Sequence, residues 1–474
     1  MSKVTHLIAA VLLASTVPLA AQVGTQGSIL GTVMDSSGAA LPGATITVTG
    51  LDTGLVQTAT SDHTGSFEIL ALPIGPYSVA VTVQGFKTWQ LERVVLTVGE
   101  RKKITPVLEV GNISEQVSVV GGAPLLQTER SSVQTVVEMQ QIRELPLSTR
   151  NPVVLVNLAP GMRFTGSGGP ERGSTVQGFG LRSNQTEFQL DGLNANASMD
   201  EGAITIPNVD TIAEFSVETS SFSAENGRNP LQVVMATKSG TNSFHGTVWE
   251  FNQNDRFSAR NAFSTSDPPK LNRNQYGAAI GGPVLRNRTF FFGSFEGTPI
   301  DTDDLYNSVV PQAAMLQGDF SSLGHAIIDP TTGQPFPGNR IPAHRISSAS
   351  QFFFPYLLTP NDPDGGFHAV APVTDDTYQY TARLDHQFTA SQRIYGRWVM
   401  NKNPTDSPGY SPDVRSANKT TQHNIGVNYT NSLSSTLLLT VTGGYLKSDN
   451  RFTSPVYCAL KSKLPRGECE PCRP

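Results

Sequence analysis

Cysteine, charge and long apolar runs are all scarce in this sequence. Only three cysteines occur among the 474 residues, and charged side chains make up 15% of them, below the quarter or so that is usual in soluble proteins. Glycine and small polar residues fill the gap, which favours β-structure with many turns. The net charge is −5 and no basic cluster is present, so there is no reason to expect a nucleic-acid partner.

The three cysteines lie close together near the C-terminus, at Cys458, Cys469 and Cys472. No second ligand pair follows the last two at metal spacing, which weakens a zinc or redox hypothesis. A disulfide within a surface loop would suit an exported chain. A third hypothesis is that residues 451–474 are foreign to the fold, through a truncated or shifted reading frame. The residues leave these alternatives open.

No constellation of catalytic residues stands out. The histidines are scattered and show neither an HExxH motif nor a His–carboxylate spacing. The glycine-rich stretch Gly166–Gly180 lacks the residue patterns of phosphate-binding loops. The acidic stretches 301–304 and 361–366 fit solvated turns better than calcium ligands. We therefore predict no enzymatic activity, no cofactor, no catalytic residue and no metal ligand.

Residues 1–21 have the pattern of a secretory signal peptide. Lys3 precedes the apolar run Leu7–Ala20, which ends at small residues. The run has about fourteen residues, whereas a membrane-spanning helix needs about 20. Because no later stretch approaches that length, any membrane-spanning part must consist of strands. We therefore expect an exported chain.

Residues 22–110 alternate short strand patterns with turn signals. Ile46 and Val48 fall on one face of residues 44–49, and a turn is indicated at residues 62–65. Several short strands at regular spacing predict a small β-sandwich.

Residues 111–122 are expected to form a linker. Within the linker lies a short β-prone segment made of Glu115, Gln116, Val117, Ser118, Val119 and Val120. Such a segment can add an edge strand to the sheet of a partner protein. It can equally be the last strand of the sandwich or plain linker, and the residues leave that choice open.

Residues 123–242 combine helix and strand patterns. Apolar residues at helix-like spacing predict one helix over 132–145 and a second, shorter one over 151–158. Strands are predicted over 212–218 and 231–237. The sequence therefore predicts a mixed α/β domain.

Residues 243–450 show seven strand patterns joined by connections that alternate in length. The strands are predicted over 244–253, 275–284, 289–297, 377–388, 393–401, 423–429 and 437–447. The short connections are 285–288, 389–392 and 430–436, and the long ones are 254–274, 298–376 and 402–422. Outer-membrane β-barrels place short turns on one side and long loops on the other. The pattern predicts part of a transmembrane antiparallel β-barrel in contact with outer-membrane lipid.

The segment 377–388 shows the alternation of strand faces most clearly. Tyr378, Tyr380 and Leu384 fall on one face, and Arg383 and Asp385 fall on the other. We expect the first face to contact lipid and the second to face the inside of the barrel.

Motifs in the first two modules resemble known domains. The patterns G-x-V-x-D, P-G-A-x-I-x-V, D-x-x-G-x-F and L-P-x-G-x-Y within 22–110 resemble the carboxypeptidase regulatory-like domain. That domain is a transthyretin-like sandwich, also grouped with carbohydrate-binding-like folds, and the resemblance implies no peptidase activity. Residues 123–242 resemble the plug domain of TonB-dependent outer-membrane receptors, through the motifs Ile142–Pro146, Leu158–Gly161, Gly178–Arg182, Gln189–Leu193 and Val234–Gly240.

The strand region is similar to receptors of the Oar-like type, which carry an N-terminal sandwich of this kind. The matching motifs are Phe244–Phe251, Asn274–Gly277, Gly281–Val284 and Thr289–Gly293. The resemblance implies a TonB-type periplasmic energy-coupling protein as partner and an unknown extracellular ligand, with carbohydrate as one candidate class. It implies that sandwich and plug lie on the periplasmic side, and it makes Glu115–Val120 a candidate TonB box.

The strand count departs from that family. Receptors of this class close about twenty-two strands around the plug, whereas seven are predicted here, and an open sheet leaves two edges unsatisfied in hydrocarbon. We therefore expect the chain to be the N-terminal part of a longer receptor. The leading hypothesis is energy-coupled uptake. The alternative is an outer-membrane protein for surface adhesion, interaction or secretion, which would not need the linker to pair with TonB.

Overall fold

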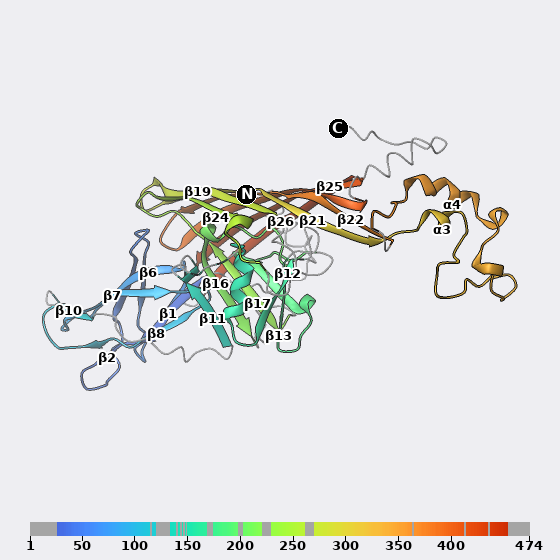
Figure 1. The fold of residues 1–474 in the computed structure, drawn as a ribbon. Coiled ribbons are helices and arrows are strands. Elements are labelled where there is room, and N and C mark those ends of the chain that lie inside the picture. Colours follow the sequence, from blue (N-terminus) through green and yellow to red (C-terminus); the bar gives the residue numbers. More distant parts are fainter. Residues whose placement is uncertain are drawn as a thin grey trace, which may run out of the picture.

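The computed structural model shows three units that follow one another along the chain (Figure 1). An N-terminal β-sandwich is followed by a central unit with a five-stranded sheet and then by a long antiparallel sheet. The predicted mainly-β fold is confirmed, with a sandwich, a middle domain that combines strands with short helices, and an open antiparallel sheet. The structure describes residues 26–113, 116–119, 133–138, 141–142, 145, 147, 149–167, 174–197, 202–219, 229–260, 270–362, 365–411, 414–434 and 437–453. The predicted signal peptide and the three cysteines lie outside these residues.

The sandwich contains two sheets, with strand orders β5-β1-β8 and β10-β7-β6-β3-β4, and a small ladder of β2 and β9. Alternate residues such as Ile46 and Val48 in β3, and Val79 and Val81 in β6, fill its apolar core. The strands are β1 Gly27–Thr32, β2 Met34–Asp35, β3 Thr45–Gly50, β4 Val56–Thr60, β5 Ser66–Leu72, β6 Gly75–Thr82, β7 Thr88–Leu96, β8 Arg101–Ile104, β9 Val107–Leu108 and β10 Gln116–Val119.

The motif residues of the sandwich set its turns. The carboxylate of Asp62 accepts hydrogen bonds from the backbone N–H groups of Thr64 and Ser66, at 2.8 and 2.9 Å. Gly65 adopts a φ of +73° in this turn, a conformation that favours glycine. The Tyr77 hydroxyl donates to the carbonyl of Pro73 at 2.7 Å and braces the start of β6. Side chains in the sequence motifs therefore direct the chain from strand to strand.

The segment proposed for partner binding forms the last strand of the sandwich. Residues 116–119 make up β10, which runs parallel to β7 with Gln116 opposite Thr88 and Val119 opposite Leu91. Within the described part of the chain, β10 pairs only with β7 and is an edge strand. Glu115 and Val120 lie outside the described residues. Of the two structural alternatives, the structure thus shows a sandwich strand, and the coupling role of this segment stays a prediction.

The central unit is built on a sheet of order β11-β16-β17-β14-β15, with a separate hairpin of β12 and β13. Phe188, Phe215 and Met235 belong to the apolar core of this unit. Its strands are β11 Val133–Glu138, β12 Met162–Ser167, β13 Ser174–Gly178, β14 Thr186–Leu190, β15 Leu193–Asn194, β16 Ile212–Thr219 and β17 Leu231–Thr237. Its short 3₁₀ helices are η1 Pro152–Leu158, η2 Ser183–Gln185 and η3 Val209–Thr211.

One helix prediction in this unit is wrong. Residues 133–138, within the helix predicted over 132–145, form β11 and pair antiparallel with β16. The valine spacing suits a helix, but valine and threonine also favour strands, and pairing with a distant neighbour decides between them. The helix predicted over 151–158 is confirmed as η1, where the Asn151 side chain accepts a hydrogen bond from the N–H of Val153. Both strand predictions are confirmed by β16 and β17.

All seven strand predictions in the long sheet are confirmed. Strand β21 continues the line of β20, and β23 continues that of β22, so the nine strands of this sheet form seven longer strands. Each of the seven lies beside the one that precedes it in the chain. The bounds are β18 His245–Asn254, β19 Leu271–Leu285, β20 Thr289–Thr298, β21 Ile300–Val309, β22 Gly366–Asp375, β23 Thr377–Gln387, β24 Gln392–Ser411, β25 Val414–Ser432 and β26 Leu438–Thr453. A 3₁₀ helix, η5 Asp255–Phe257, follows β18.

The connections β19–β20, β23–β24 and β25–β26 lie at one end of this sheet, here called the turn end. The connections β18–β19, β21–β22 and β24–β25 lie at the opposite end, here called the loop end. The prediction of a long loop over 402–422 is wrong, because β24 and β25 continue until Ser411 pairs with Val414. Pro404 and Pro408 lie within this stretch, and both stay in register with β25. Proline is tolerated in a strand only where its missing N–H is not needed. The acidic stretch 301–304 was likewise predicted as a turn, and it lies in strand β21.

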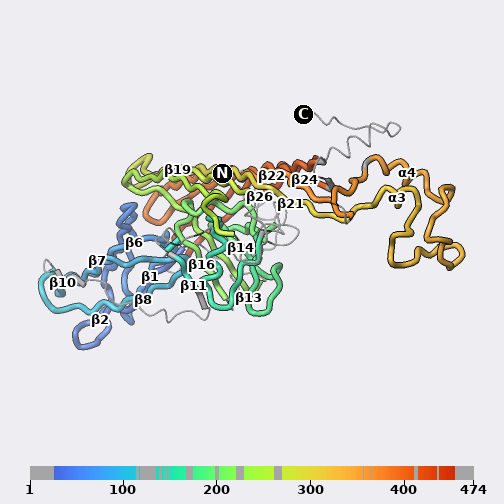
Figure 2. The backbone as a smooth tube through the Cα atoms, viewed as in Figure 1, coloured from blue at the N-terminus to red at the C-terminus, as the bar shows by residue number. Residues whose placement is uncertain are grey.

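Residues 310–362 form an arm beyond the loop end (Figure 2). The arm is ordered by its own polar contacts: the Arg345 guanidinium donates to both carboxylate oxygens of Asp329, at 2.9 and 3.1 Å. This contact holds the pKa of Asp329 well below its usual range. The helices of the arm are α3 Ala313–Leu316, η6 Pro337–Asn339, η7 Ala343–Arg345, α4 Ser348–Phe353 and η8 Phe354–Tyr356. Neither these nor any other helix in the described residues is long and apolar enough to span a membrane.

Candidate functional site between the central unit and the long sheet

Asp191 lies where the central unit meets the long sheet. It follows β14 in a tight turn, where Asp191 and Gly192 have φ values of +52° and +77°. The backbone N–H of Asp191 donates to the carbonyl of Met235 at 2.9 Å. Its carboxylate accepts hydrogen bonds from the N–H and the hydroxyl of Thr237, at 2.8 and 2.7 Å. Strands β14 and β17 therefore fix this buried carboxylate in place.

Two arginines of the long sheet form ion pairs with Asp191. Nε of Arg397 in β24 lies 2.9 Å from one carboxylate oxygen, and a terminal nitrogen of Arg383 in β23 lies 3.4 Å from the other. Arg383 also pairs with Asp385, at 2.8 Å. The two positive and two negative charges balance. Because a buried charge without a partner is costly, this cluster favours one position of the central unit against the sheet.

Neutral groups complete the contact around this charged cluster. The Tyr395 hydroxyl donates to the carbonyl of Asp191 at 2.9 Å, and the Arg383 guanidinium lies 4.3 Å from the centre of the Tyr395 ring. The Ser239 hydroxyl donates to Asp385 at 2.9 Å, and Arg397 donates to the side-chain oxygen of Asn424 at 2.9 Å. Hydrogen bonds thus reach from β14 and the end of β17 to strands β23, β24 and β25.

A second polar contact joins the central unit to strands β18 and β20. The Asn208 side chain donates to the hydroxyl of Ser294 at 3.0 Å. Arg150 pairs with Asp210 inside the central unit, and its guanidinium lies 4.2 Å from the centre of the Phe251 ring in β18. The central unit is therefore held against the sheet here as well as around Asp191, by hydrogen bonds, ion pairs and a cation–π contact.

This chemistry suits a domain that is fixed at rest and can still be displaced. Water can replace hydrogen bonds at little net cost, whereas separating large apolar surfaces is unfavourable. Val399 of β24 is the member of the long sheet that joins the apolar core of the central unit. Among the described residues, no group of three His, Cys, Asp or Glu side chains is placed to hold a metal ion.

The structure confirms the predicted facing of strand β23. Arg383 and Asp385 contact the central unit, while Tyr380 and Leu384 are 36% and 52% exposed on the opposite face. Sequence reasoning missed Asp191 and Arg397. Arg397 could have been identified, because it is a charged residue on the inward face of a predicted membrane strand. The predicted coupling segment lies in the sandwich and is not part of this site.

Family models cover nearly the whole chain in three consecutive matches. Residues 28–109 match the carboxypeptidase regulatory-like domain, residues 126–234 the TonB-dependent receptor plug domain, and residues 236–462 an outer membrane beta barrel domain. The chain belongs to the TonB-dependent receptors. The central unit is the plug of this receptor and the long sheet is its barrel sheet, which indicates the outer membrane as its location. The family comprises receptors and transporters rather than enzymes.

The receptor is similar to the TonB-dependent transporter Oar from Myxococcus xanthus, with 26% identity over 293 residues. The match covers 56% of this chain and 26% of that protein, so the chain spans about a quarter of this relative. A mutant ferric enterobactin receptor from Pseudomonas aeruginosa, solved with enterobactin, matches at 12% identity and a TM-score of 0.39, over 67% of this chain and 41% of that one. The siderophore receptor PirA from Acinetobacter baumannii matches at 12% identity and 0.34, over 69% and 49%.

Proposed function

We propose that the receptor takes up a ligand across the outer membrane, driven by a TonB-type periplasmic protein. Residues 1–21 direct export, and the turn end, plug and sandwich face the periplasm. The arm and the loop end face the exterior, where the ligand binds. The periplasmic protein pairs with Glu115–Val120, and its pull shifts the plug. No catalytic step is part of this proposal.

The polar contact around Asp191 is the observation that supports uptake most directly. A plug held by balanced charges and hydrogen bonds can leave its place when water enters, and it returns to the same position because the charges favour it. The position of β10 adds support, because an edge strand can accept a partner strand through main-chain hydrogen bonds. The site and the coupling segment together fit energy-dependent displacement of the plug.

Val117→Pro tests the coupling segment. Proline removes a backbone N–H and fixes φ, so it should prevent a partner strand from pairing with β10. We expect cross-linking between a photoreactive residue at Ser118 and the TonB-type protein to fall by about tenfold or more in intact cells, the equivalent of about 1.4 kcal/mol. Energised uptake should be lost, while binding of ligand at the cell surface should remain.

Val117→Thr is the matched control, since threonine keeps the N–H and the β-branched side chain. It should cross-link like the parent. Because Val117 lies opposite Trp89, tryptophan fluorescence reports whether the sandwich stays intact in each variant. If Val117→Pro cross-links and transports normally, the coupling segment lies elsewhere. A protein used for adhesion alone would show no effect of a protonophore on the cross-link.

Glycan-derived molecules are the first ligand class to test. The reason is limited to fold analogy, because the sandwich type is grouped with carbohydrate-binding-like folds. A glycan array probed with the purified full-length receptor gives the measurement. Binding to no member of the array would remove this class and leave the uptake proposal in place.

A further inference from the structure

The turn that follows β7 is a rigid contact point of the sandwich. Glu100 accepts hydrogen bonds from the N–H and the hydroxyl of Thr97, at 3.0 and 2.9 Å, and pairs with Lys102 at 2.8 Å. Burial alone would raise the pKa of Glu100, but the contacts with Lys102 and Thr97 lower it below its usual value. Gly99 has a φ of +60°. The ionised carboxylate thus holds Val98 in one orientation.

Val98 contacts the plug through both its backbone and its side chain. Its N–H donates to both carboxylate oxygens of Glu214 in β16, at 2.8 and 3.0 Å. Its side chain is fully buried in a cluster with Val234 and Ala236 of β17, against which Ile74 of the sandwich also packs. Every residue of β17 is buried, because its other face lies in the core of the plug. The sandwich and the plug therefore share a dry apolar contact beside a charge-assisted hydrogen bond.

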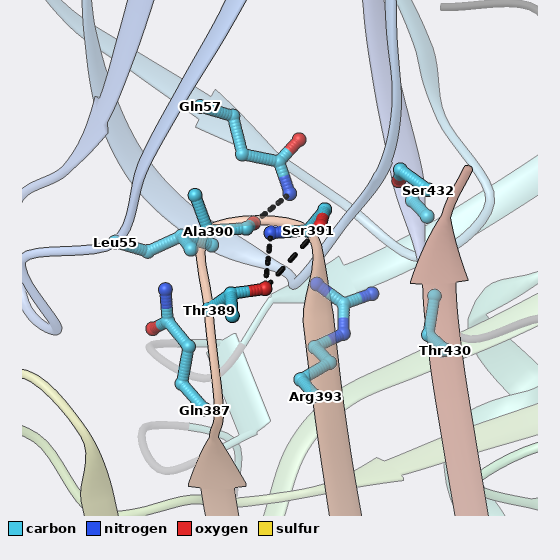
Figure 3. A pocket seen from close by; sticks show the side chains of 10 residues that line it. Leu55, Gln57, Gln387, Thr389, Ala390, Ser391, Arg393, Thr430 and Ser432 are labelled. Atoms are coloured by element: carbon cyan, nitrogen blue, oxygen red, sulfur yellow. Dashed lines mark hydrogen bonds between the residues drawn. The ribbon is translucent and has the colours of Figure 1, made fainter. Parts of the chain in front are cut away.

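The sandwich is held less firmly by the barrel sheet. In Figure 3 the Gln57 side chain reaches the turn between β23 and β24, where it donates to the carbonyl of Ala390 at 3.3 Å. The N–H of Asn242 donates to the carbonyl of Asp52 at 2.8 Å. These two contacts join exposed or half-buried groups, and a third hydrogen bond runs from the Gln26 side chain to the buried hydroxyl of Thr430 at 2.9 Å. Each is a hydrogen bond that water can replace at little net cost. Under load, the contact with the barrel sheet should separate before the contact with the plug.

Strand β7 links the coupling segment to this contact. β10 pairs with residues 88–91 at the start of β7, and β7 ends at Leu96, two residues before Val98. A continuous path therefore leads from Ser118 to Glu214. It runs through the backbone hydrogen bonds between β10 and β7, along the chain from β7 to Val98, and through the hydrogen bond from Val98 to Glu214. This route, which can be followed through the sandwich in Figure 1, does not include residues 120–132.

We propose that the sandwich and the plug move as one body, and that force applied to β10 reaches the plug through the Val98–Glu214 contact. Residues 120–132 then carry load only after this contact has separated. The inference rests on the proposed function, because it specifies how the pull of the periplasmic protein is transmitted. In this proposal, a pull on the sandwich moves the plug with it.

Single-molecule pulling of the full-length receptor in a supported bilayer tests the route of force. The molecule is pulled through a DNA handle joined to an azido amino acid at Ser118. An insertion of about ten residues between Gly121 and Gly122 adds about 35 Å of extended chain. We expect the pulling force to rise at the same extension with and without the insertion. A force that rises only after about 35 Å of further extension in the insertion variant would falsify the proposal.

When Glu214→Ala is added to the insertion variant, the force should rise only after about 35 Å of further extension, because the sandwich no longer holds the plug. Glu68→Ala is the matched control, because Glu68 pairs with Arg101 within the sandwich at 3.0 Å, and no shift is expected. Equal behaviour of the two variants would exclude Glu214 as the contact that transmits force.

A cross-link gives the reference extension if Glu214→Ala does not fold. It joins Val98→Cys to Ala236→Cys through a short thiol cross-linker, in a chain whose native cysteines are replaced by serine. The insertion variant should resist at that same extension without the linker. Since pulling needs no energised partner, its outcome is independent of the cross-linking at Ser118.

Discussion

At the scale of single residues, the resting position of the plug depends on three charged side chains, Asp191, Arg383 and Arg397. The carboxylate comes from the plug and both guanidinium groups come from the barrel sheet, and each of the three side chains is at most 12% exposed. Buried ion pairs often add little stability compared with apolar residues of the same size. A charge that stays buried without its partner is costly, so this cluster defines one arrangement of plug and barrel sheet rather than a strong attraction.

Asp191→Asn removes one of the two negative charges. Arg397, whose side chain is 0% exposed, then lacks a counter-charge, and the loss of a partner from a buried pair costs about 3–5 kcal/mol. We expect the plug of the purified full-length receptor to become protease-sensitive at a lower urea concentration. Adding Arg397→Gln should recover part of the loss, since the unpaired charge is then absent.

Arg415→Gln is the control for this prediction. Arg415 pairs with Asp406 at 2.9 Å, and the two side chains are 31% and 43% exposed. Exposed pairs of this kind contribute about 0–1 kcal/mol. A plug that resists protease equally well in Asp191→Asn and Arg415→Gln would show that the buried cluster does not hold it.

At this scale the sequence predicts which way a side chain faces but not what it contacts. Alternation within residues 377–388 placed Arg383 on the inner face, because side chains in a strand alternate strictly. Its partner Asp191 belongs to another unit, and no local pattern specifies how two units dock. Val98 was not identified for the same reason, since its contact with Glu214 uses a backbone N–H that any residue except proline would offer.

At the scale of elements, the face of the strand on which a residue lies controls the cost of a charge there. Leu384 is exposed on the outer face of β23, opposite Phe291 and Gly396. Leu384→Arg should destabilise the full-length receptor by about 2–4 kcal/mol if it lies near mid-membrane. Gln387→Arg should cost much less, because Gln387 falls on the same inner face of β23 as Arg383 and Asp385 and does not face lipid. Urea unfolding in lipid vesicles measures both, and equal costs would contradict this placement.

Strands of the barrel sheet could be predicted from sequence and β11 could not, for a physical reason. A strand with one apolar and one polar face shows its period over any ten residues. In β11 the valines and threonines fit a helix as well as a strand, and only the ladder to β16, about 80 residues away, selects the strand. Similarly, the extension of β24 and β25 beyond residue 402 depends on their mutual register, which Pro404 and Pro408 do not disturb.

At the scale of the whole molecule, the sandwich contacts both the plug and the barrel sheet. Gln57→Cys and Ala390→Cys, in a chain whose native cysteines are serine, would be joined by a short bis-thiol cross-linker that contains a reducible disulfide. The cross-linker takes the place of the Gln57 side chain, which reaches to within 3.3 Å of the Ala390 carbonyl, so the resting plug should keep its protease resistance. Pulling at Ser118 should then fail to displace the plug while the cross-linker is intact, at forces that displace it after reduction, because the sandwich can no longer leave the barrel sheet.

A second cysteine pair separates this effect from that of a disulfide as such. Thr47→Cys and Thr58→Cys face each other across β3 and β4 within the sandwich, where antiparallel partners are close enough to bridge. This disulfide links the sandwich only to itself, so oxidised and reduced molecules should release the plug at the same force. If the bridge between residues 57 and 390 also has no effect, the sandwich does not move with the plug, and residues 120–132 must transmit the pull.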